Sequence, residues 1–358
     1  MGKITGFVIK RWKLLLNLTT LIAVIIALYI IRHDLVTTFR NLTKVNAWFL
    51  VLMVPLELLN YHSQARLYQR LFKIVGNKLS YRYLFLASLE LNFVNHVFPS
   101  GGAAGLSYFG FRIKNDEITG GRATLIQIMK LALTFISFEI LIIMSVFFLA
   151  VGNRVNDFTI LVAGVMSTML LVGSVLFAYI VGKRERINTF LEYVTKSLNK
   201  LIRRFRPVES ADAIDIQRAK RVFEDFHYSY TQIKKSGNEI LPPLLYALLC
   251  NLTEVAVVYV VFLAFGHVVN LGAVILAYGI ANFAGMISIL PGGIGIYEAL
   301  MTAVLLATGV SATFALPVII MYRVLNTLLQ ISPGYYLYQK NISKQGNHKS
   351  QANKLTPS

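Results

Sequence analysis

Charged side chains inside long apolar runs are the residues of this sequence with the clearest potential for chemistry. Lys130 and Arg323 each lie within such a run, and Glu57 and Glu254 lie in the apolar runs that come before them. A charge at the centre of a bilayer costs at least about 2.5–3.5 kcal/mol on insertion scales, so each one indicates either a function or a buried partner. We expect Lys130 and Arg323 to bind an anionic group, most naturally a lipid phosphate. The alternative is neutralisation by Glu57, Glu139 or Glu254, for helix packing.

Two glycine-rich interruptions accompany these charges, at residues 98–105 (FPSGGAAG) and 290–299 (LPGGIGIYEA). A break in a helix at membrane depth frees N–H and C=O groups, which protein or a water-filled cavity must then satisfy. Glycine amides near a helix start can bind an anion, whereas the alternative is that small residues only permit close packing. The glycines in question are Gly101, Gly102, Gly292, Gly293 and Gly295.

Polar residues near the breaks extend this candidate binding site. Glu298 follows the proline of the second break by about two helical turns, where it can pair with Arg323, bind a cationic headgroup or carry a coupling proton. Tyr297 is a hydrogen-bonding neighbour at the same place. Arg112, which ends the first broken segment, is interpreted as a surface anchor that extends its charge toward water.

Composition defines the class of protein. The chain has 358 residues, of which 56% are hydrophobic, and its mean hydropathy is +0.60, so we predict an integral membrane protein. The net charge of +18 comes from basic residues next to apolar runs, which favours contact with anionic lipid over nucleic acid. Cys250 is the single cysteine, which excludes an intramolecular disulfide and a cysteine-based metal cluster. No hydrolase, transferase or ATP-binding motif occurs, so we expect no enzyme activity, cofactor or metal.

The pattern of apolar runs predicts an all-α polytopic membrane protein with about six full spans and two re-entrant helical hairpins. The first run follows basic residues, but no small-residue cleavage site follows it, so we interpret it as an uncleaved span. Each hairpin contains one of the two glycine-rich breaks and is too short on either side for a full crossing. The expected spans are 14–31, 47–65, 125–151, 159–181, 241–265 and 314–338.

The two halves of the chain resemble each other. Repeat one, about 47–151, and repeat two, about 241–338, each contain a span with an acidic residue, a Pro-Gly break and a span with a basic residue. An Asn-Phe pair precedes each break and contributes Asn92 and Asn282 to the candidate site. The first repeat starts outside and the second inside, so we predict an inverted repeat of the kind found in alternating-access transporters. The alternative is a pair of ordinary proline kinks without duplication.

The remaining segments connect or follow these repeats. Residues 183–240 combine a periodic apolar face with a basic face, which predicts an amphipathic connector lying on the cytoplasmic membrane surface. Residues 339–358 form a polar tail that we expect to be disordered, which leaves residues 1–338 as the transmembrane domain. Most of the 35 Lys and Arg residues then lie on the cytoplasmic side, as do both termini.

The motifs at 95–105 (NHVFPSGGAAG) and 290–299, together with Tyr322-Arg323, resemble the transmembrane-region family of lysylphosphatidylglycerol synthases, also called flippase-like domain proteins. The resemblance covers about residues 14–338. In two-domain members this region moves aminoacylated phosphatidylglycerol between leaflets, and a separate C-terminal domain performs the aminoacyl transfer. The resemblance therefore implies a stand-alone flippase-like protein without the synthase domain. Other members of the group are linked to glycosyltransferases and polyprenyl-phosphate lipids.

We therefore predict a cell-membrane lipid flippase that moves a lipid with an anionic headgroup, either a phospholipid or a polyprenyl-phosphate-linked lipid. One alternative is a membrane subunit that docks a glycosyltransferase or another lipid-modifying enzyme, which the long connector motivates. A secondary transporter for a small solute or an ion fits the repeat equally well.

Overall fold

The fold is described from a computed structural model. It describes residues 45–98, 103–113, 120–152, 156–181, 237–287 and 295–352, with isolated residues at 29, 32, 36, 40–42, 118, 183, 185–186 and 293. All regular elements in these ranges are helices. In chain order they are α2 (Ala47–Val51), α3 (Met53–Ile74), α4 (Tyr81–Val97), α5 (Ala103–Ile113), α6 (Gly120–Val151), α7 (Asp157–Val181), η1 (Gly237–Ile240), α10 (Leu241–Ala264), α11 (Leu271–Ile287), α12 (Ile296–Ala307) and α13 (Ala312–Ala352).

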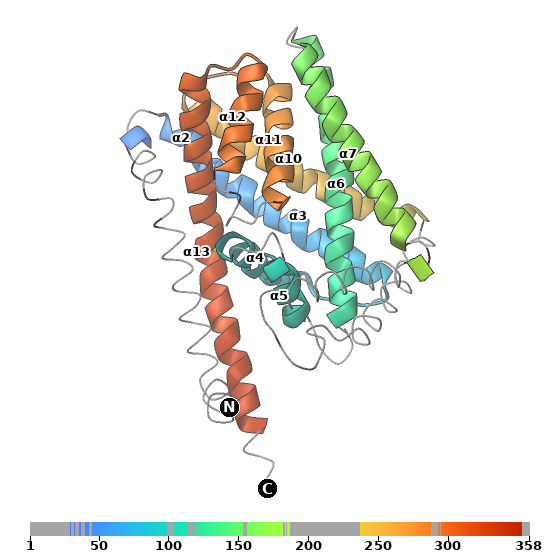
Figure 1. The fold of residues 1–358 in the computed structure, drawn as a ribbon. Coiled ribbons are helices and arrows are strands. Elements are labelled where there is room, and N and C mark those ends of the chain that lie inside the picture. The colour runs from blue at the N-terminus through green and yellow to red at the C-terminus, as the bar shows by residue number, and fades with distance from the viewer. Residues whose placement is uncertain are drawn as a thin grey trace, which may run out of the picture.

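The helices α3 and α10 pack along each other through the middle of the molecule (Figure 1). Asn60 on α3 joins them, because its Nδ2 donates to the backbone oxygen of Cys250 at 2.9 Å and to Oγ1 of Thr253 at 3.0 Å. Buried amides that are fully paired in this way hold two helices in one register. The α3–α10 pair is therefore the frame on which the other helices are arranged.

The same turn follows both central helices. Gly76 after α3 has φ 85° and Gly266 after α10 has φ 77°, in the left-handed region that favours glycine. The next residue donates its N–H back across the helix end in each case, from Asn77 to Phe72 O at 2.9 Å and from His267 to Phe262 O at 3.0 Å.

A capping side chain then starts the helix that follows each turn. Ser80 Oγ accepts from Tyr83 N at the start of α4, and Asn270 Oδ1 accepts from Gly272 N at the start of α11. Both caps satisfy N–H groups that the first turn of a helix cannot pair internally. The connection from α3 to α4 and the connection from α10 to α11 therefore have the same local structure.

A short helix in each half of the chain packs against a long helix of the other half. Helix α4 packs against α5 and against α13, while α11 packs against α12 and against α6. Glycines permit both crossings, since a Cβ at Gly334 of α13 would lie 2.6 Å from Leu89 O and one at Gly272 of α11 would lie 2.9 Å from Leu149 N. In Figure 1 the α11–α12 pair lies in the upper part of the molecule and the α4–α5 pair in the lower part.

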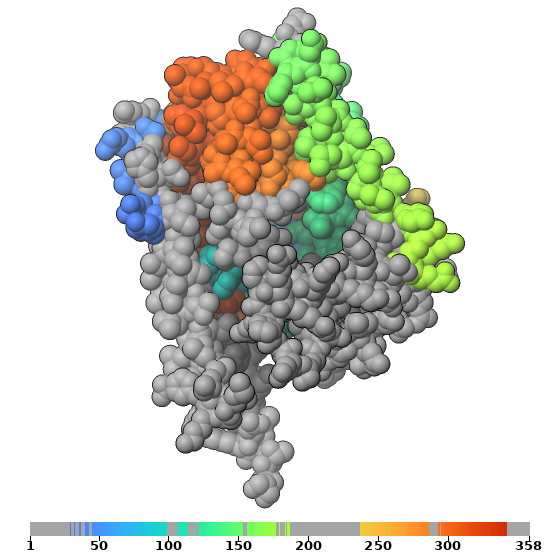
Figure 2. Space-filling view, viewed as in Figure 1, coloured from blue at the N-terminus to red at the C-terminus, as the bar shows by residue number. Residues whose placement is uncertain are grey.

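Four helices in the described ranges are long and apolar enough to cross a membrane, namely Arg122–Val151, Asp157–Leu176, Gly237–Ala264 and Ala312–Asn341. Helix α7 forms a ridge along one edge of the face in Figure 2, and large apolar side chains such as Leu161, Val165 and Val175 are exposed on it. An apolar helix that exposes such residues is suited to lipid contact. The chain is thus a multi-pass helical membrane protein.

These four helices coincide with four of the six expected spans. The first expected span, 14–31, and most of the connector 183–240 lie outside the described residues. The second, 47–65, is divided at Leu52 into α2 and α3, and α3 continues to Ile74 through the basic residues that follow the apolar run. The count of six spans stays a prediction. The expectation of disorder from residue 339 differs from the fold, in which α13 continues as a helix to Ala352.

The close packing of α13 on α4 at Gly334 and of α11 on α6 at Gly272 predicts how substitutions there affect stability. We expect Gly334→Leu or Gly272→Leu to destabilise the protein by about 1–3 kcal/mol, because the added side chain would be forced against backbone of α4 or α6. The measurement is thermal unfolding in detergent. The matched control is Gly164→Leu in α7, where a Cβ meets no atom within 4 Å. Equal melting temperatures for Gly334→Leu and Gly164→Leu would contradict this packing.

Candidate functional site

The second break brings Arg323 and Glu298 together. Arg323 Nε on α13 lies 3.0 Å from Glu298 Oε1 in the first turn of α12. The other carboxylate oxygen, Oε2, accepts from the backbone N–H of Gly295 at 2.6 Å, and Gly295 has φ 87°. Glu298 thus caps the start of α12 and neutralises Arg323 at once. Their side chains stay 16% and 18% exposed, so this ion pair is reachable from outside the core.

The aromatic ring of Tyr297 lies against the guanidinium. Arg323 Cζ lies 4.4 Å from the ring centroid of Tyr297, which is a cation–π contact. Asn282 Nδ2 donates to Tyr297 Oη at 3.4 Å and to Tyr278 O at 3.1 Å, which links α11 to the start of α12. The ring centroids of Tyr297 and Tyr322 are 6.4 Å apart, and both residues are buried.

A row of polar side chains on α13 continues from this point. Tyr322 Oη donates to Glu254 Oε2 at 3.1 Å and Asn326 Nδ2 donates to the same oxygen at 3.2 Å. Gln330 Nε2 lies 3.3 Å from Glu57 Oε1 and 3.4 Å from Glu254 Oε1, so one amide bridges two carboxyl groups. The spacing of four residues puts the three donors on one face of the helix.

Lys130 belongs to a separate chain of hydrogen bonds. Its Nζ donates to Gln64 Oε1 at 3.2 Å and lies 5.2 Å from the ring centroid of Tyr68. Gln64 Nε2 then donates to Asn60 Oδ1 at 2.7 Å, and Asn60 donates to α10. Lys130 and Arg323 thus belong to different described networks, and the expectation that both bind one anion stays a prediction.

The first broken segment has its own ion pair. Arg112 Nε lies 2.8 Å from Glu90 Oε2, and only 2% of the Glu90 side chain is exposed. Tyr108 Oη donates to Glu90 at 2.6 Å, and Asn341 Nδ2 of α13 donates to it at 2.9 Å. Arg112 is consequently a partly buried ion-pair partner of Glu90 and not the surface anchor suggested by its position in the sequence.

The two broken segments approach each other at α13. His96, in the last turn of α4, interacts electrostatically with Arg323, and its Nδ1 lies 2.9 Å from Asn92 O. Gly293 packs on backbone of Gly285, with room for no side chain, because a Cβ would lie 3.0 Å from Gly285 Cα. Gly101, Gly102 and Gly292 lie outside the described residues.

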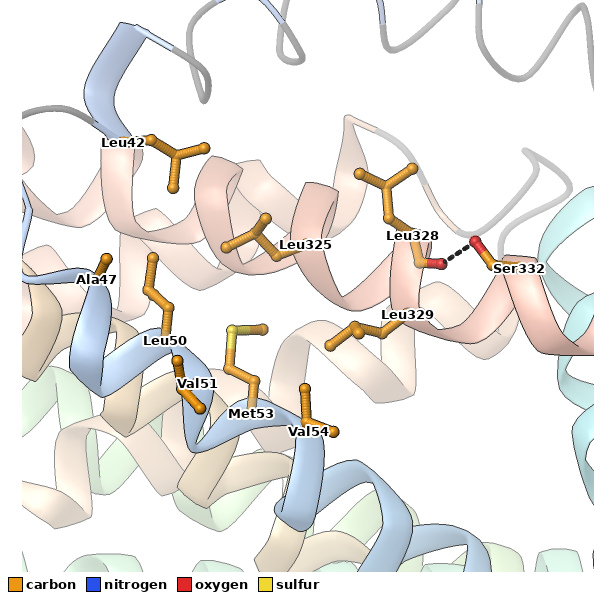
Figure 3. A pocket seen from close by; sticks show the side chains of 10 residues that line it. All are labelled: Leu42, Ala47, Leu50, Val51, Met53, Val54, Leu325, Leu328, Leu329 and Ser332. Atoms are coloured by element: carbon orange, nitrogen blue, oxygen red, sulfur yellow. Dashed lines mark hydrogen bonds between the residues drawn. The ribbon is translucent and has the colours of Figure 1, made fainter.

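An apolar groove lies on another side of α13. It has a volume of about 500 Å³ and lies between α13 and the α2–α3 segment, as Figure 3 shows. Aliphatic side chains face one another across it, with Ser332 at one end, where its hydroxyl donates to Leu328 O at 2.8 Å. The lining residues are Leu42, Ala47, Leu50, Val51, Met53, Val54, Leu325, Leu328, Leu329 and Ser332.

Several residues of these networks were not predicted from the sequence. They are Asn60, Gln64, Asn326 and Gln330. A signal was present, since polar residues recur at helical spacing in apolar segments: Asn60 and Gln64 in one, Asn326 and Gln330 in another. Among the described residues, no cluster of three or more His, Cys, Asp or Glu side chains could hold a metal ion.

Fold and site together define a multi-pass helical membrane protein whose charged and polar side chains meet at interrupted short helices. Residues 14–334 match the family described as the lysylphosphatidylglycerol synthase TM region. The chain therefore belongs to that family.

Two archaeal relatives are similar over different lengths of the chain. The UPF0104 membrane protein MJ1595 of Methanocaldococcus jannaschii is 22% identical over 304 residues, which cover 83% of this chain and 85% of that protein. The UPF0104 membrane protein PH1989 of Pyrococcus horikoshii is 26% identical over 146 residues, which cover 40% of this chain and 44% of that protein. Both names agree with a membrane location.

The Lys130 chain makes a prediction about stability. We expect Gln64→Leu to destabilise the protein by about 1–3 kcal/mol, because it leaves the Lys130 ammonium and the Asn60 amide oxygen without a partner. The double variant Gln64→Leu/Lys130→Met should recover part of that loss, since the uncompensated charge is removed with its partner. Thermal unfolding of wild type, both single variants and the double variant in detergent measures this. Strict additivity of the two single effects would refute the coupling.

Proposed function

We propose that this protein is a flippase-like transporter that moves a lipid with an anionic headgroup between the leaflets of the cell membrane. The observation that carries the proposal is the partly exposed Arg323–Glu298 pair at the start of α12. A guanidinium presents several N–H donors in a fixed plane that suits a phosphate, and a neighbouring helix start favours negative charge. Family membership supports a lipid-related role.

Capture of the headgroup would proceed by exchange of partners. Glu298 neutralises Arg323 in the empty site and keeps the N–H of Gly295 paired. An incoming phosphate would compete with Glu298 for the guanidinium, while the Tyr297 ring supports its other face. The pair thus protects the cation from the apolar surroundings until an anion arrives, because an unpaired charge there is costly.

The apolar groove on α13 is the proposed path for a hydrocarbon chain of the same lipid. Its residues Leu325 and Leu329 share a helix with Arg323, so a lipid could place its phosphate at Arg323 and a chain along the groove. Aliphatic walls match an acyl or a prenyl chain equally well, since both are hydrocarbon. Phosphate and hydrocarbon are common to phospholipids and polyprenyl phosphates.

Alternating access by an inverted repeat is the proposed mode of movement. The matched turns at Gly76 and Gly266 and the reciprocal crossings of α4 with α13 and of α11 with α6 support a duplication. The pairs α4–α5 and α11–α12 would be the re-entrant hairpins that open to opposite sides, with both termini in the cytoplasm. Docking of a lipid-modifying enzyme depends on the connector 183–240, most of which lies outside the described residues.

The test is leaflet exchange in liposomes that contain the purified protein and fluorescent phosphatidylglycerol, with a membrane-impermeant quencher added outside. We expect Arg323→Ala to slow exchange roughly 10- to 100-fold, the effect of losing a charge-assisted contact of about 1.5–3 kcal/mol. Arg323→Lys should retain part of the activity, because it keeps the charge but loses the planar fork. The control is Arg82→Ala, whose side chain is exposed at the start of α4.

Comparing lipids with different headgroups tests whether the proposed site prefers an anionic headgroup. Fluorescent phosphatidylcholine should be exchanged more slowly than phosphatidylglycerol, because its cationic choline group lies close to the phosphate and opposes binding at Arg323. A fluorescent polyprenyl phosphate in a parallel set of liposomes distinguishes the two lipid classes. Exchange of all three at the rate of protein-free liposomes would reject the proposed transport of these lipids.

A further inference from the structure

Glu57 on α3 and Glu254 on α10 form a second site, deeper than Arg323. Gln330 Nε2 lies within 3.4 Å of an oxygen of each, so the two carboxyl groups face each other across one amide. Only 4% of Glu57 is exposed. Two negative charges this close in a poorly hydrated interior repel strongly, so a single proton held by the pair lowers its free energy.

The donors around the pair are divided unequally. Glu254 accepts hydrogen bonds from Tyr322, Asn326 and Gln330, whereas Glu57 shares only the Gln330 amide. All of these donors are neutral. Glu57 Oε2 is buried and has no hydrogen-bond partner in the structure. The arrangement therefore favours a carboxylate at Glu254 and a neutral carboxylic acid at Glu57, since ionised carboxylates need several donors when buried.

Two further buried acceptors lie beside the pair. The side-chain oxygens of Asn326 and Gln330 are buried without a partner, and both residues are more than nine-tenths buried. Among the partnerless buried atoms of this cluster, Glu57 Oε2, Asn326 Oδ1 and Gln330 Oε1 are acceptors and Tyr61 Oη can donate or accept, so a further donor or positive charge would satisfy the remaining acceptors. A proton on Glu57 supplies one.

Other titratable groups face the pair from each neighbouring helix. They interact with one or both carboxyl groups, and they are Tyr61 on α3, Cys250 on α10, Tyr278 on α11, Tyr297 on α12 and Tyr322 on α13. Each of these groups is neutral at physiological pH when unperturbed. Lys130 on α6 donates to Gln64 and His96 on α4 faces Arg323. By contrast, the two carboxyl groups face each other across one amide, which favours a proton shared between them.

We propose that Glu57 and Glu254 form a proton-binding site, with Glu57 as the residue that carries the exchangeable proton and α13 as the element that couples it to Arg323. The coupling part of this proposal depends on the proposed transport function. Tyr322, Asn326 and Gln330 lie on the same helix as Arg323, so a shift of α13 on headgroup binding moves their donors relative to both carboxyl groups. Changing those hydrogen bonds changes the proton affinity of the pair.

Infrared difference spectroscopy of the purified protein in lipid nanodiscs tests the proton site without any transport. At neutral pH the wild type should show the C=O band of a protonated carboxyl group, shifted in deuterated water, and Glu57→Gln should lose that component. Gln is a close mimic of a neutral Glu, so this variant should fold. In Glu254→Gln the component should disappear at lower pH than in wild type, because the neighbouring charge that favours the proton is gone.

Two controls make the assignment specific. Glu239→Gln removes an exposed carboxyl group in η1, and Glu139→Gln removes another buried one whose Oε2 has no partner. Both should leave the Glu57 component in place. A spectrum that Glu57→Gln does not change would overturn the proposal. Loss of the band when sodium chloride replaces choline chloride would also overturn it, since a sodium ion would then be the ligand.

Leaflet exchange under a pH gradient tests the coupling separately. A gradient across the liposome membrane should change the exchange rate of the wild type several-fold, and Glu57→Gln should exchange lipid at a rate that the gradient does not alter. Wild-type exchange that ignores the gradient would overturn the coupling. A Glu57-dependent infrared band in a protein that moves none of the lipids would reject the transport function and leave the proton site standing.

Discussion

The arrangement of α3, α10 and α13 depends on hydrogen bonds to two buried carboxyl groups that lie where these helices meet. Glu57 and Glu254 lie where no bulk water can pair them, and the amides and hydroxyl that reach them come from α13. Polar groups in such surroundings cost several kcal/mol when they are unpaired, so the helices must keep one register. The glycines at the crossings then allow α4 and α11 to lie close enough to complete the packing.

Helix α13 connects all parts of the candidate mechanism. One face of α13 carries the polar side chains that contact Glu254 and Glu57. The same helix also carries Arg323, and another of its faces lines the apolar groove. In the proposed mechanism, a change at one of these places would reach the others through this one helix. Helix α4 of the first broken segment also packs on α13.

Position along the chain was a good guide to some contacts and a poor one to others. The pairing of Glu298 with Arg323 was among the options foreseen from the sequence, and the structure confirms that contact. Neutralisation by an acidic residue was one of two options for Lys130, but its hydrogen-bond partner is the neutral Gln64. Arg112 pairs with Glu90 across the first break. The amides of Gln64, Asn326 and Gln330 were not predicted, although an amide can also pair with a buried charged group by hydrogen bonding.

The sequence by itself determined the class of protein, because apolar runs, flanking basic residues and interrupted segments reflect the bilayer and the covalent chain alone. It also marked the interruptions after α4 and before α12, where proline and glycine act locally, although Pro317 and Pro333 lie within the continuous helix α13. Only the tertiary structure decided which charged and amide groups meet. Glu57, Glu254 and Gln330 are far apart in the chain, and their contact depends on the rotation and register of three packed helices, which no local pattern encodes.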